Sequence, residues 1–238
     1  MSTAGWPAAD RSRPSGRHAT TVQRDASTVS GAGQSPPPKG AWARNLRKII
    51  MASILLTPPA GEPLSLAEAK AFLRLETADD DPLIAAFISA ARLHVETQTG
   101  LALVTQSWRM VLDCWPANGR IVVRPAPLQA LTAARVFDSG GEARAIDIQA
   151  FVPDAGTSTL SFIPWALPMP TRIAAGIELD IAVGFGDAAA DVPEPLRQAI
   201  RILVAHWHEN RAIVAGAVVA PVPSNAAALI APYRMLPL

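Results

Sequence analysis

The hydrophobic pattern of the chain changes period twice, from helical spacing to alternation and back. Apolar residues recur at helical spacing in residues 65–73, 82–99 and 194–211. Between them, residues 105–183 contain short β-prone runs separated by clusters of Gly, Pro, Asn and Asp. The predicted order of elements is therefore two helices, a block of about six strands, and a third helix.

The first two predicted helices have clear start signals. Ser65 and Glu68 have capping-box spacing, in which each side chain bonds the backbone of the other residue. The sequence DDDP at residues 79–82 predicts that carboxylates cap the second helix, with Pro82 in its first position. Gly100 is predicted to end this helix. A divalent-metal site at the three aspartates is the less favoured interpretation.

The runs in the middle of the chain are predicted to be strands of a small antiparallel β-domain. The sequence DSGG at residues 138–141 predicts a hairpin between two of them. The runs are Thr105–Asp113, Arg120–Arg124, Ala134–Phe137, Ala145–Phe151, Ser158–Ile163 and Ile177–Val183.

The last helix has a strongly one-sided pattern. Leu196, Ile200, Leu203 and Trp207 recur at i, i+4, i+7 and i+11, which places them on one helical face. We expect this face to pack on the stripe of apolar residues between Ile84 and Val95 of the second helix. A short helix is also possible at residues 226–230.

These patterns predict an α+β fold. We expect a small helical bundle, made of two N-terminal helices and a C-terminal helix, with an inserted antiparallel β-domain. Residues 1–50 are rich in Ser, Ala, Gly, Pro and Arg, and are predicted to be a disordered basic tail or to precede the true start at Met51. The remaining expected divisions are helical residues 57–104, a β-rich insertion at 105–186, helical residues 187–212 and an Ala/Pro-rich tail at 213–238.

Charge and composition narrow the functional classes. Residues 1–50 carry 8 of the 21 basic and 2 of the 20 acidic side chains, so the remainder is mildly acidic. This balance argues against a general DNA-binding surface on the folded part. The single cysteine, Cys114, excludes an internal disulfide and is expected to be a small hydrophobe on or near a strand. No apolar run is long enough to predict a membrane-spanning helix.

Motifs that invite a catalytic interpretation do not support one. The sequence GFG at residues 184–186 lacks the third glycine of a nucleotide loop and precedes acidic residues, so a strand-end turn is favoured. His206 and His208 are two positions apart, which on a helix points them about 200° apart. They therefore cannot share a metal ion. We expect no catalytic, cofactor-binding or metal-binding residues, and no enzyme activity.

The tryptophans support an alternative function. Trp108, Trp115 and Trp165 would form a stacking platform if they were exposed on one face of the β-domain. The protein would then be a binding module for a carbohydrate or another surface ligand. Packing of these tryptophans in a core or an interface is the favoured interpretation. A metal enzyme using the aspartates at 79–81, or His206 and His208, is the third hypothesis.

Four groups of segments, in this order and spacing, carry a family resemblance: Leu64–Leu75; Asp79–Gly100; Gln106–Arg109 with Arg124–Leu128; and Gly184–Arg211. They resemble the head–tail connector proteins, also called adaptor or head-completion proteins, of long-tailed phages, prophages and gene transfer agents. His208 departs from the family pattern, which has an aromatic residue there.

The resemblance implies a structural role without catalytic residues. Such proteins form a ring, commonly a dodecamer, on the portal at the capsid vertex, and the ring is part of the DNA channel between head and tail. The implied partners are other copies of the chain, the portal protein, tail or stopper/terminator proteins and, transiently, packaged double-stranded DNA, with no membrane. The implied location is the head–tail interface of the virion, and the bacterial cytoplasm during assembly.

A ring requires contact between unlike surfaces of neighbouring subunits. Because the apolar face of the last helix is expected to pack within its own chain, its outer face is left for a neighbour. The predicted subunit-interface residues are Arg197, Arg201, His208 and Arg211.

Overall fold

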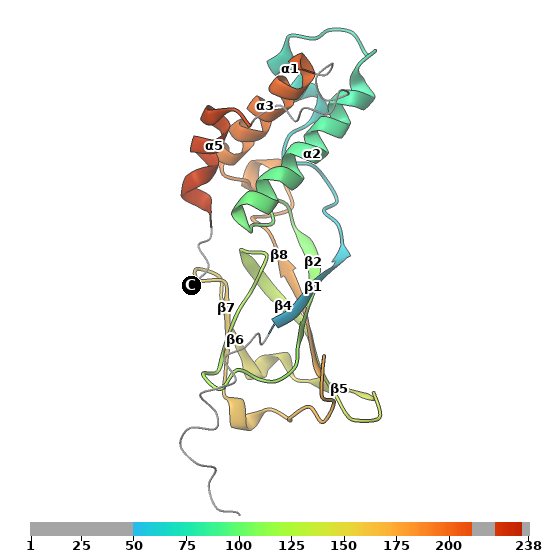
Figure 1. The fold of residues 1–238 in the computed structure, drawn as a ribbon, viewed down its shortest axis with the longest axis vertical. Coiled ribbons are helices and arrows are strands. Elements are labelled where there is room, and N and C mark those ends of the chain that lie inside the picture. Colours follow the sequence, from blue (N-terminus) through green and yellow to red (C-terminus); the bar gives the residue numbers. More distant parts are fainter. Residues whose placement is uncertain (1–49, 211–221, 235–238) are drawn as a thin grey trace, which may run out of the picture. The chain divides into compact units, whose positions relative to one another are not determined.

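The computed structural model describes residues 50–210 and 222–234, with side chains from Ala52 onward. All of these residues belong to the unit formed by Asn45–Leu238. The unit combines α-helices with two antiparallel sheets, which confirms the predicted α+β class (Figure 1). Residues 1–49 of the tail predicted at 1–50, and the segments 211–221 and 235–238, lie outside the described residues.

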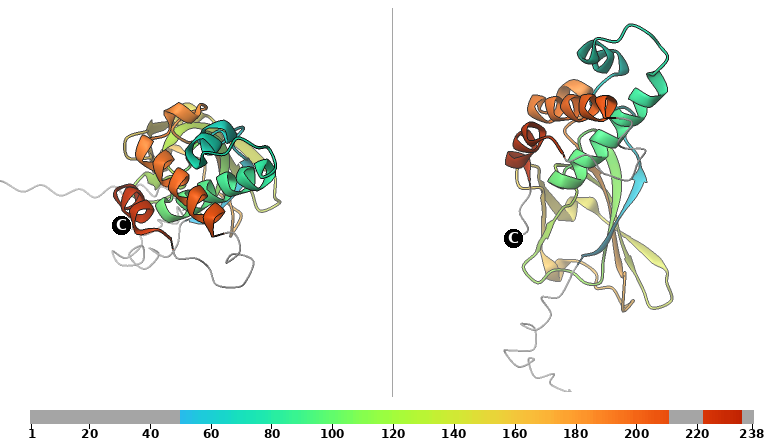
Figure 2. Two further views of the ribbon diagram at one scale, coloured as in Figure 1. Left: turned by 90° about the horizontal axis from the view of Figure 1, so that it is seen from above. Right: turned by 45° about the horizontal axis from the view of Figure 1, so that its top comes forward.

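The helices gather at one end of this unit and the strands at the other (Figure 2). Within the predicted Ala/Pro-rich tail, the short helix begins slightly before the predicted residue. The helices are α1 (Leu66–Leu73), α2 (Asp81–Thr99), α3 (Glu194–Glu209) and α5 (Ser224–Ile230).

The cap of α1 and the end of α2 are as predicted. The backbone N–H of Glu68 donates to Ser65 Oγ over 3.2 Å, and the backbone N–H of Ser65 donates to Glu68 Oε2 over 3.0 Å. This reciprocal pair is the capping box. Gly100 caps α2 with a φ of 73°, in the left-handed region that glycine enters at little cost.

The start of α2 differs from the prediction. Asp80 is the N-terminal cap residue, but its side chain makes no capping hydrogen bond, and Pro82 is the second helical residue. The carboxylates bind side chains of neighbouring helices instead. Asp81 Oδ1 lies 2.6 Å from Lys70 Nζ, and Asp80 Oδ2 lies 3.2 Å from His208 Nε2. A tertiary ion pair and a tertiary contact with an imidazole therefore replace the local cap.

The strands form two sheets. The five-stranded sheet has the order β1-β2-β8-β4-β5, and the three-stranded sheet has the order β3-β7-β6. Every neighbouring pair is antiparallel. The strands are β1 (Ile50–Thr57), β2 (Gln106–Leu112), β3 (Arg120–Val122), β4 (Leu128–Phe137), β5 (Ala143–Ile146), β6 (Phe151–Asp154), β7 (Thr159–Phe162) and β8 (Ile177–Val183).

The predicted strands need three corrections. Strand β1 was not predicted; it precedes the helices and pairs with β2, so the larger sheet is not built from the insertion alone. Strand β4 begins at Leu128, because its first half pairs with β8 through two irregularities in register. The run Ala145–Phe151 divides into β5 and β6, because Asp147 caps a 3₁₀ turn at Ile148–Ala150.

The predicted hairpin joins β4 to β5. Asp138 N donates to Glu142 O over 3.1 Å, and Gly141 N donates to Asp138 O over 3.1 Å. The flanking residues pair in antiparallel register, with Phe137 opposite Ala143. The sequence DSGG therefore forms the predicted turn.

Two hydrophobic cores hold the unit together. One lies between the sheets, and the other lies among the helices. In the helical core, the apolar face of α3 packs on the inner stripe of α2, which confirms the predicted contact. The buried apolar residues that α2 and α3 contribute to this core are Ile84, Ile88, Ala91, Val95, Leu196, Ala199, Ile200, Leu203 and Val204.

Candidate functional site

Two segments connect the helices to the larger sheet: one joins α2 to β2, and the other joins β8 to α3. We call them the two crossings, and they run side by side. Thr105 N donates to Gly186 O over 3.0 Å, and Phe185 N donates to Leu103 O over 3.3 Å. Gly184 has a φ of 133°, and a Cβ atom there would lie 2.8 Å from the backbone of Thr105. The glycine therefore permits close approach of two backbones. The GFG sequence is a strand-end turn, as predicted.

Glu96 of α2 ties this crossing to β2. Its Oε1 accepts hydrogen bonds from Leu103 N over 3.0 Å and from Gln106 Nε2 over 2.7 Å. Its Oε2 accepts from Arg92 Nη1 over 2.8 Å. Gln106 Oε1 in turn accepts from Trp108 Nε1 over 3.1 Å. One carboxylate therefore connects the helix, the crossing and the sheet.

We call this connection between α2 and β2 the joint. Its charged groups are largely buried, and the charge of each depends on the others. Arg92 is 9% exposed, and its Nε donates to Glu62 Oε2 over 2.8 Å. Burial disfavours its charged form, but the hydrogen bonds and charges of Glu62 and Glu96 outweigh burial and raise the pKa of Arg92. Burial raises the pKa of Glu96, against the opposing hydrogen bonds of Leu103, Arg92 and Gln106. Removing Arg92 would leave Glu96 without a counter-charge, and removing Glu96 would leave Arg92 with Glu62 alone.

A second ionic network crosses the open face of the larger sheet. Arg109 Nε donates to Asp180 Oδ1 over 2.6 Å, and Arg135 Nη1 donates to Asp180 Oδ2 over 2.9 Å. Glu178 lies 3.2 Å from Arg109. The hydrogen bond from Arg109 lowers the pKa of Asp180, and the same bond raises the pKa of Arg109. These contacts join β2, β8 and β4 in a single register.

The predicted interface arginines have partners in their own chain. Arg197 Nη2 donates to Glu68 Oε1 over 2.6 Å, and its Nε donates to Pro63 O over 3.1 Å. Arg201 donates to Glu194, and this hydrogen bond lowers the pKa of the Glu194 carboxyl. Backbone and side-chain hydrogen bonds from Ser65 lower the pKa of Glu68. Arg197 thus connects α3 to the beginning of α1, and Arg201 Nη2 lies 3.9 Å from Glu68 Oε1.

The other two predicted interface residues are placed differently. His208 Nε2 lies 3.2 Å from Asp80 Oδ2, so this residue joins the end of α3 to the start of α2. Arg211 lies outside the described residues. A contact of Arg197, Arg201, His208 and Arg211 with a neighbouring subunit stays a prediction. The structure adds that three of the four side chains are engaged within the chain.

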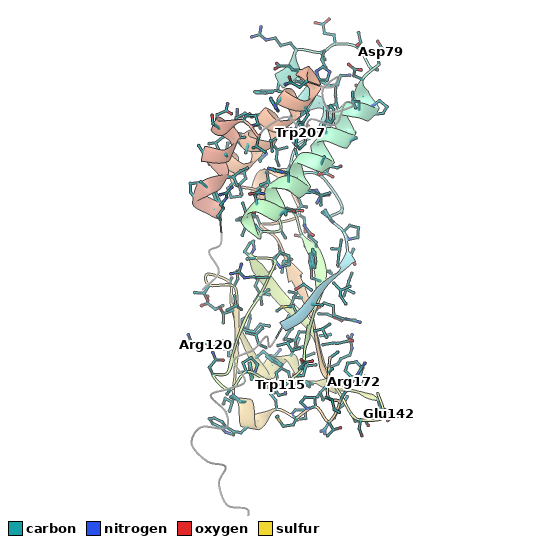
Figure 3. All side chains as sticks on the ribbon, viewed as in Figure 1. Asp79, Trp115, Arg120, Glu142, Arg172 and Trp207 are labelled. Carbon is teal, nitrogen blue, oxygen red and sulfur yellow. The ribbon has the colours of Figure 1, made fainter. Side chains whose placement is uncertain are left out.

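The three tryptophans of the alternative hypothesis do not form a common platform. Trp115 is 6% exposed, packs on Phe151 and Phe162, and lies inside the β-rich part (Figure 3). Trp108 is half-buried, with its indole nitrogen bonded to Gln106. Only Trp165 of the three is open to solvent, at 88% exposure. The favoured packing interpretation is therefore confirmed for Trp115.

The described residues offer no metal site. Within the ranges 50–210 and 222–234, no three His, Cys, Asp or Glu side chains are grouped to hold an ion. Cys114 follows the end of β2, near a strand as predicted, but its side chain is exposed rather than packed. None of the described helices has the length and apolar content needed to cross a bilayer.

Two hollows lie on different sides of the helices. One, of about 310 Å³, has an apolar lining between α2 and β2 that includes Leu93, Trp108 and Pro125. The other, of about 360 Å³, lies over α1, α3 and the start of α5. Neither brings together a nucleophile, a base and an oxyanion donor, the arrangement expected of a hydrolytic site. The second hollow is lined by Phe72, Ile202, Ala205, His206, Glu209, Pro223 and Asn225.

Comparison with protein families identifies the chain. The family model described as "Head completion protein" matches residues 62–236, which is most of the sequence. The chain belongs to the head completion protein family. The match confirms the resemblance carried by the two N-terminal helices, the start of the β-rich part and the last helix. Comparison with curated protein sequences gave no match.

Solved structures of gene transfer agent (GTA) particles contain similar chains. A chain of the neck of an empty GTA particle, computed with C6 symmetry, is 27% identical with a TM-score of 0.65. A chain of the virion of a native GTA particle is 27% identical with a TM-score of 0.66. A chain of the native neck, computed with C12 symmetry, is 26% identical with a TM-score of 0.65. Each likeness covers 79% of this chain and 97% of the other.

Proposed function

We propose that the protein is a structural head–tail connector subunit that forms a ring of twelve copies on the portal. The ring is then part of the DNA channel that joins capsid and tail. The observation that carries this proposal is the likeness, over nearly the whole of the other chain, to a chain of a GTA neck computed with C12 symmetry. The family match over residues 62–236 supports the same role.

The chemistry of the described residues agrees with a structural role. Their ionic networks connect secondary-structure elements, as Glu96 connects α2 to β2 and Asp180 connects three strands. Residues 51–238 carry more acidic than basic side chains, which suits a conduit that must release DNA. In this role the protein needs no cofactor and performs no catalysis.

The proposed partners follow from the position of such a ring. Neighbouring copies of the chain form the ring, the portal protein binds one end, and tail or stopper/terminator proteins bind the other. Packaged double-stranded DNA passes through with transient contact. The protein is located at the head–tail interface of the virion and, before assembly, in the bacterial cytoplasm.

Electron microscopy of the purified full chain, alone and mixed with its portal protein, tests this function. We expect rings with twelvefold symmetry that dock coaxially on the portal. A portal from an unrelated particle is the matched control and should remain bare. Particles that stay monomeric under both conditions, with no density added to the portal, would contradict the proposal.

A further inference from the structure

Helix α2 carries a second apolar stripe on the side opposite its buried one. Successive residues of an α-helix turn by about 100°, so residues at spacings of three and four share a face. On α2 the exposed residues Leu83, Ala86, Ala90, Leu93 and Thr97 have this spacing. We call them the outer stripe. Leu93 is 54% exposed, although leucine usually packs against other apolar groups.

The outer stripe contains no charged side chain. The acidic and basic residues of α2 lie off it and are bound to other groups: Asp81 to Lys70, and Arg92 to Glu62 and Glu96. A solvated helix face normally carries charged and polar residues, whereas a helix that is apolar on opposite sides is normally covered on both. The outer stripe therefore has the character of a contact surface.

Helix α3 presents a different surface on its own outer side. Ala205 and Glu209 lie opposite the core-facing residues of α3 and line the hollow of about 360 Å³ described above, together with Ile202, which is half-buried against the helical core. Phe72 of α1 lies at the same hollow and is 44% exposed. We call this surface the α1–α3 hollow. It is concave, whereas the outer stripe is a convex helix surface from Leu83 to Ala90, and its Leu93 and Thr97 line the separate hollow of about 310 Å³.

The two surfaces face in opposite directions. Helices α2 and α3 pack on each other through their inner faces, which include Ile88 and Leu203. Their outer faces must therefore point away from each other. A subunit in a ring needs two unlike, complementary surfaces on its two flanks, because each copy contacts one neighbour on each side.

We propose that the outer stripe of one copy packs into the α1–α3 hollow of the next copy around the ring. Leu83 and Leu93 fill the hollow beside Phe72, while the small side chains of Ala86 and Ala90 let the two helices approach closely. This inference rests on the proposed ring. It names the helices, rather than the sheets, as the flanks through which copies meet.

Two arginine substitutions test the two surfaces separately. Ala90→Arg blocks the outer stripe, and Ala205→Arg blocks the hollow; both positions are helical, and arginine is a good helix former. We expect each variant to lose ring formation, with self-association weakened roughly 100-fold or more, as at interface hot spots. Ala85→Arg is the matched control, because Ala85 is exposed on the charged side of the same helix. It should assemble like the wild type.

Mixing the two blocked variants distinguishes unlike from like surfaces. The Ala90→Arg chain keeps its hollow and the Ala205→Arg chain keeps its outer stripe, so the mixture should form one contact and stop at heterodimers. Mass photometry of each variant and of the mixture measures this, with unchanged melting by circular dichroism as the control for folding.

The outcomes separate this inference from the proposed function. If both blocked variants still form rings like those of the wild type, the proposed interface is wrong and the connector function stands. Heterodimers in the mixture, with a wild type that never closes into rings, would support the interface and contradict the ring. A mixture without heterodimers, when each variant alone is monomeric, would overturn the pairing of these two surfaces.

Discussion

The two faces of α2 are similar in composition and different in environment. The inner face contains Ile84, Ile88 and Val95, which are buried against α3, while the outer face contains Leu83 and Leu93, which are exposed. The difference lies in the partner and not in the stripe itself. Helix α3 supplies the complementary face within the chain, whereas the outer stripe stays exposed, with Leu93 and Thr97 at the hollow between α2 and β2. An apolar face thus indicates a contact, but it does not show whether the same chain or another copy supplies the covering surface.

The largest effect is expected on the inner face. Leu203 is fully buried between α3 and α2, so Leu203→Asp places a carboxylate in the helical core. We expect a loss of about 5 kcal/mol or more, enough to unfold the chain. Circular dichroism and urea titration measure it. A folded monomer that fails only in assembly would show that the two faces of the helix are exchanged.

Adjacent alanines on α2 give the sharpest contrast between its faces. Ala91 is fully buried and Ala90 is exposed. Ala91→Arg must force a long charged side chain into the core, and we expect it to cost about 4 kcal/mol. Ala90→Arg serves as the matched variant. Urea midpoints that shift equally for both alanines would contradict the assignment of the inner face.

The joint between α2 and the sheet is expected to show the next largest effect. Glu96→Ala leaves Arg92 short of a counter-charge and leaves two donors, from Leu103 and Gln106, without their acceptor. We expect a loss of about 3 kcal/mol in the free energy of unfolding. Glu209→Ala, at an exposed position, should change it by less than about 0.5 kcal/mol. Equal effects of the two substitutions in urea titrations would show that the joint contributes nothing to the free energy of unfolding.

The sheet network predicts a pH dependence at the acid side. Because Arg109 lowers the pKa of Asp180 in the folded state, the folded carboxyl binds its proton less readily than the unfolded one. The resulting stability is fully present above about pH 5 and is lost as pH falls through the folded pKa. We expect the urea midpoint to fall less steeply with acid in Asp180→Asn than in the wild type. Parallel curves would contradict this role.

The smallest effect on stability is expected on the outer face. Ala90→Arg changes an exposed helical position, so the free energy of unfolding should shift by less than about 0.5 kcal/mol. Differential scanning calorimetry of the monomer at low concentration measures this shift. A much larger loss would mean that the outer stripe packs within its own chain, which would remove the contrast between the two faces.

Local signals in the sequence predicted much of the helical part. The capping box at Ser65, the glycine at position 100 and the contact between α2 and α3 follow from spacing alone, because caps and stripes act over a few residues. The hairpin at residues 138–141 follows from its turn residues. These features require no knowledge of distant segments.

The features that sequence reasoning missed depend on distant partners. Strand β1 has no regular alternation of apolar and polar residues. It is held by pairing with β2, which begins more than 50 residues after β1 begins. Arg197 binds Glu68 of α1, so its side chain is less free than a helical wheel suggests. Arg92, charged but buried beside the apolar stripe of α2, was the one available signal of the joint, because buried arginines are normally paired.

Cross-linking tests the central claim of a ring built through unlike helix faces most directly. The chain is prepared with Cys114→Ser, because Cys114 is exposed, and with Leu93→Cys and Ala205→Cys on the two proposed surfaces. After treatment with a short bismaleimide, a denaturing gel should show a ladder of covalent multimers that ends at the ring number. Ala85→Cys with Ala205→Cys should give no ladder. A single band at the monomer for the first pair, from a sample that forms rings by electron microscopy, would contradict the account.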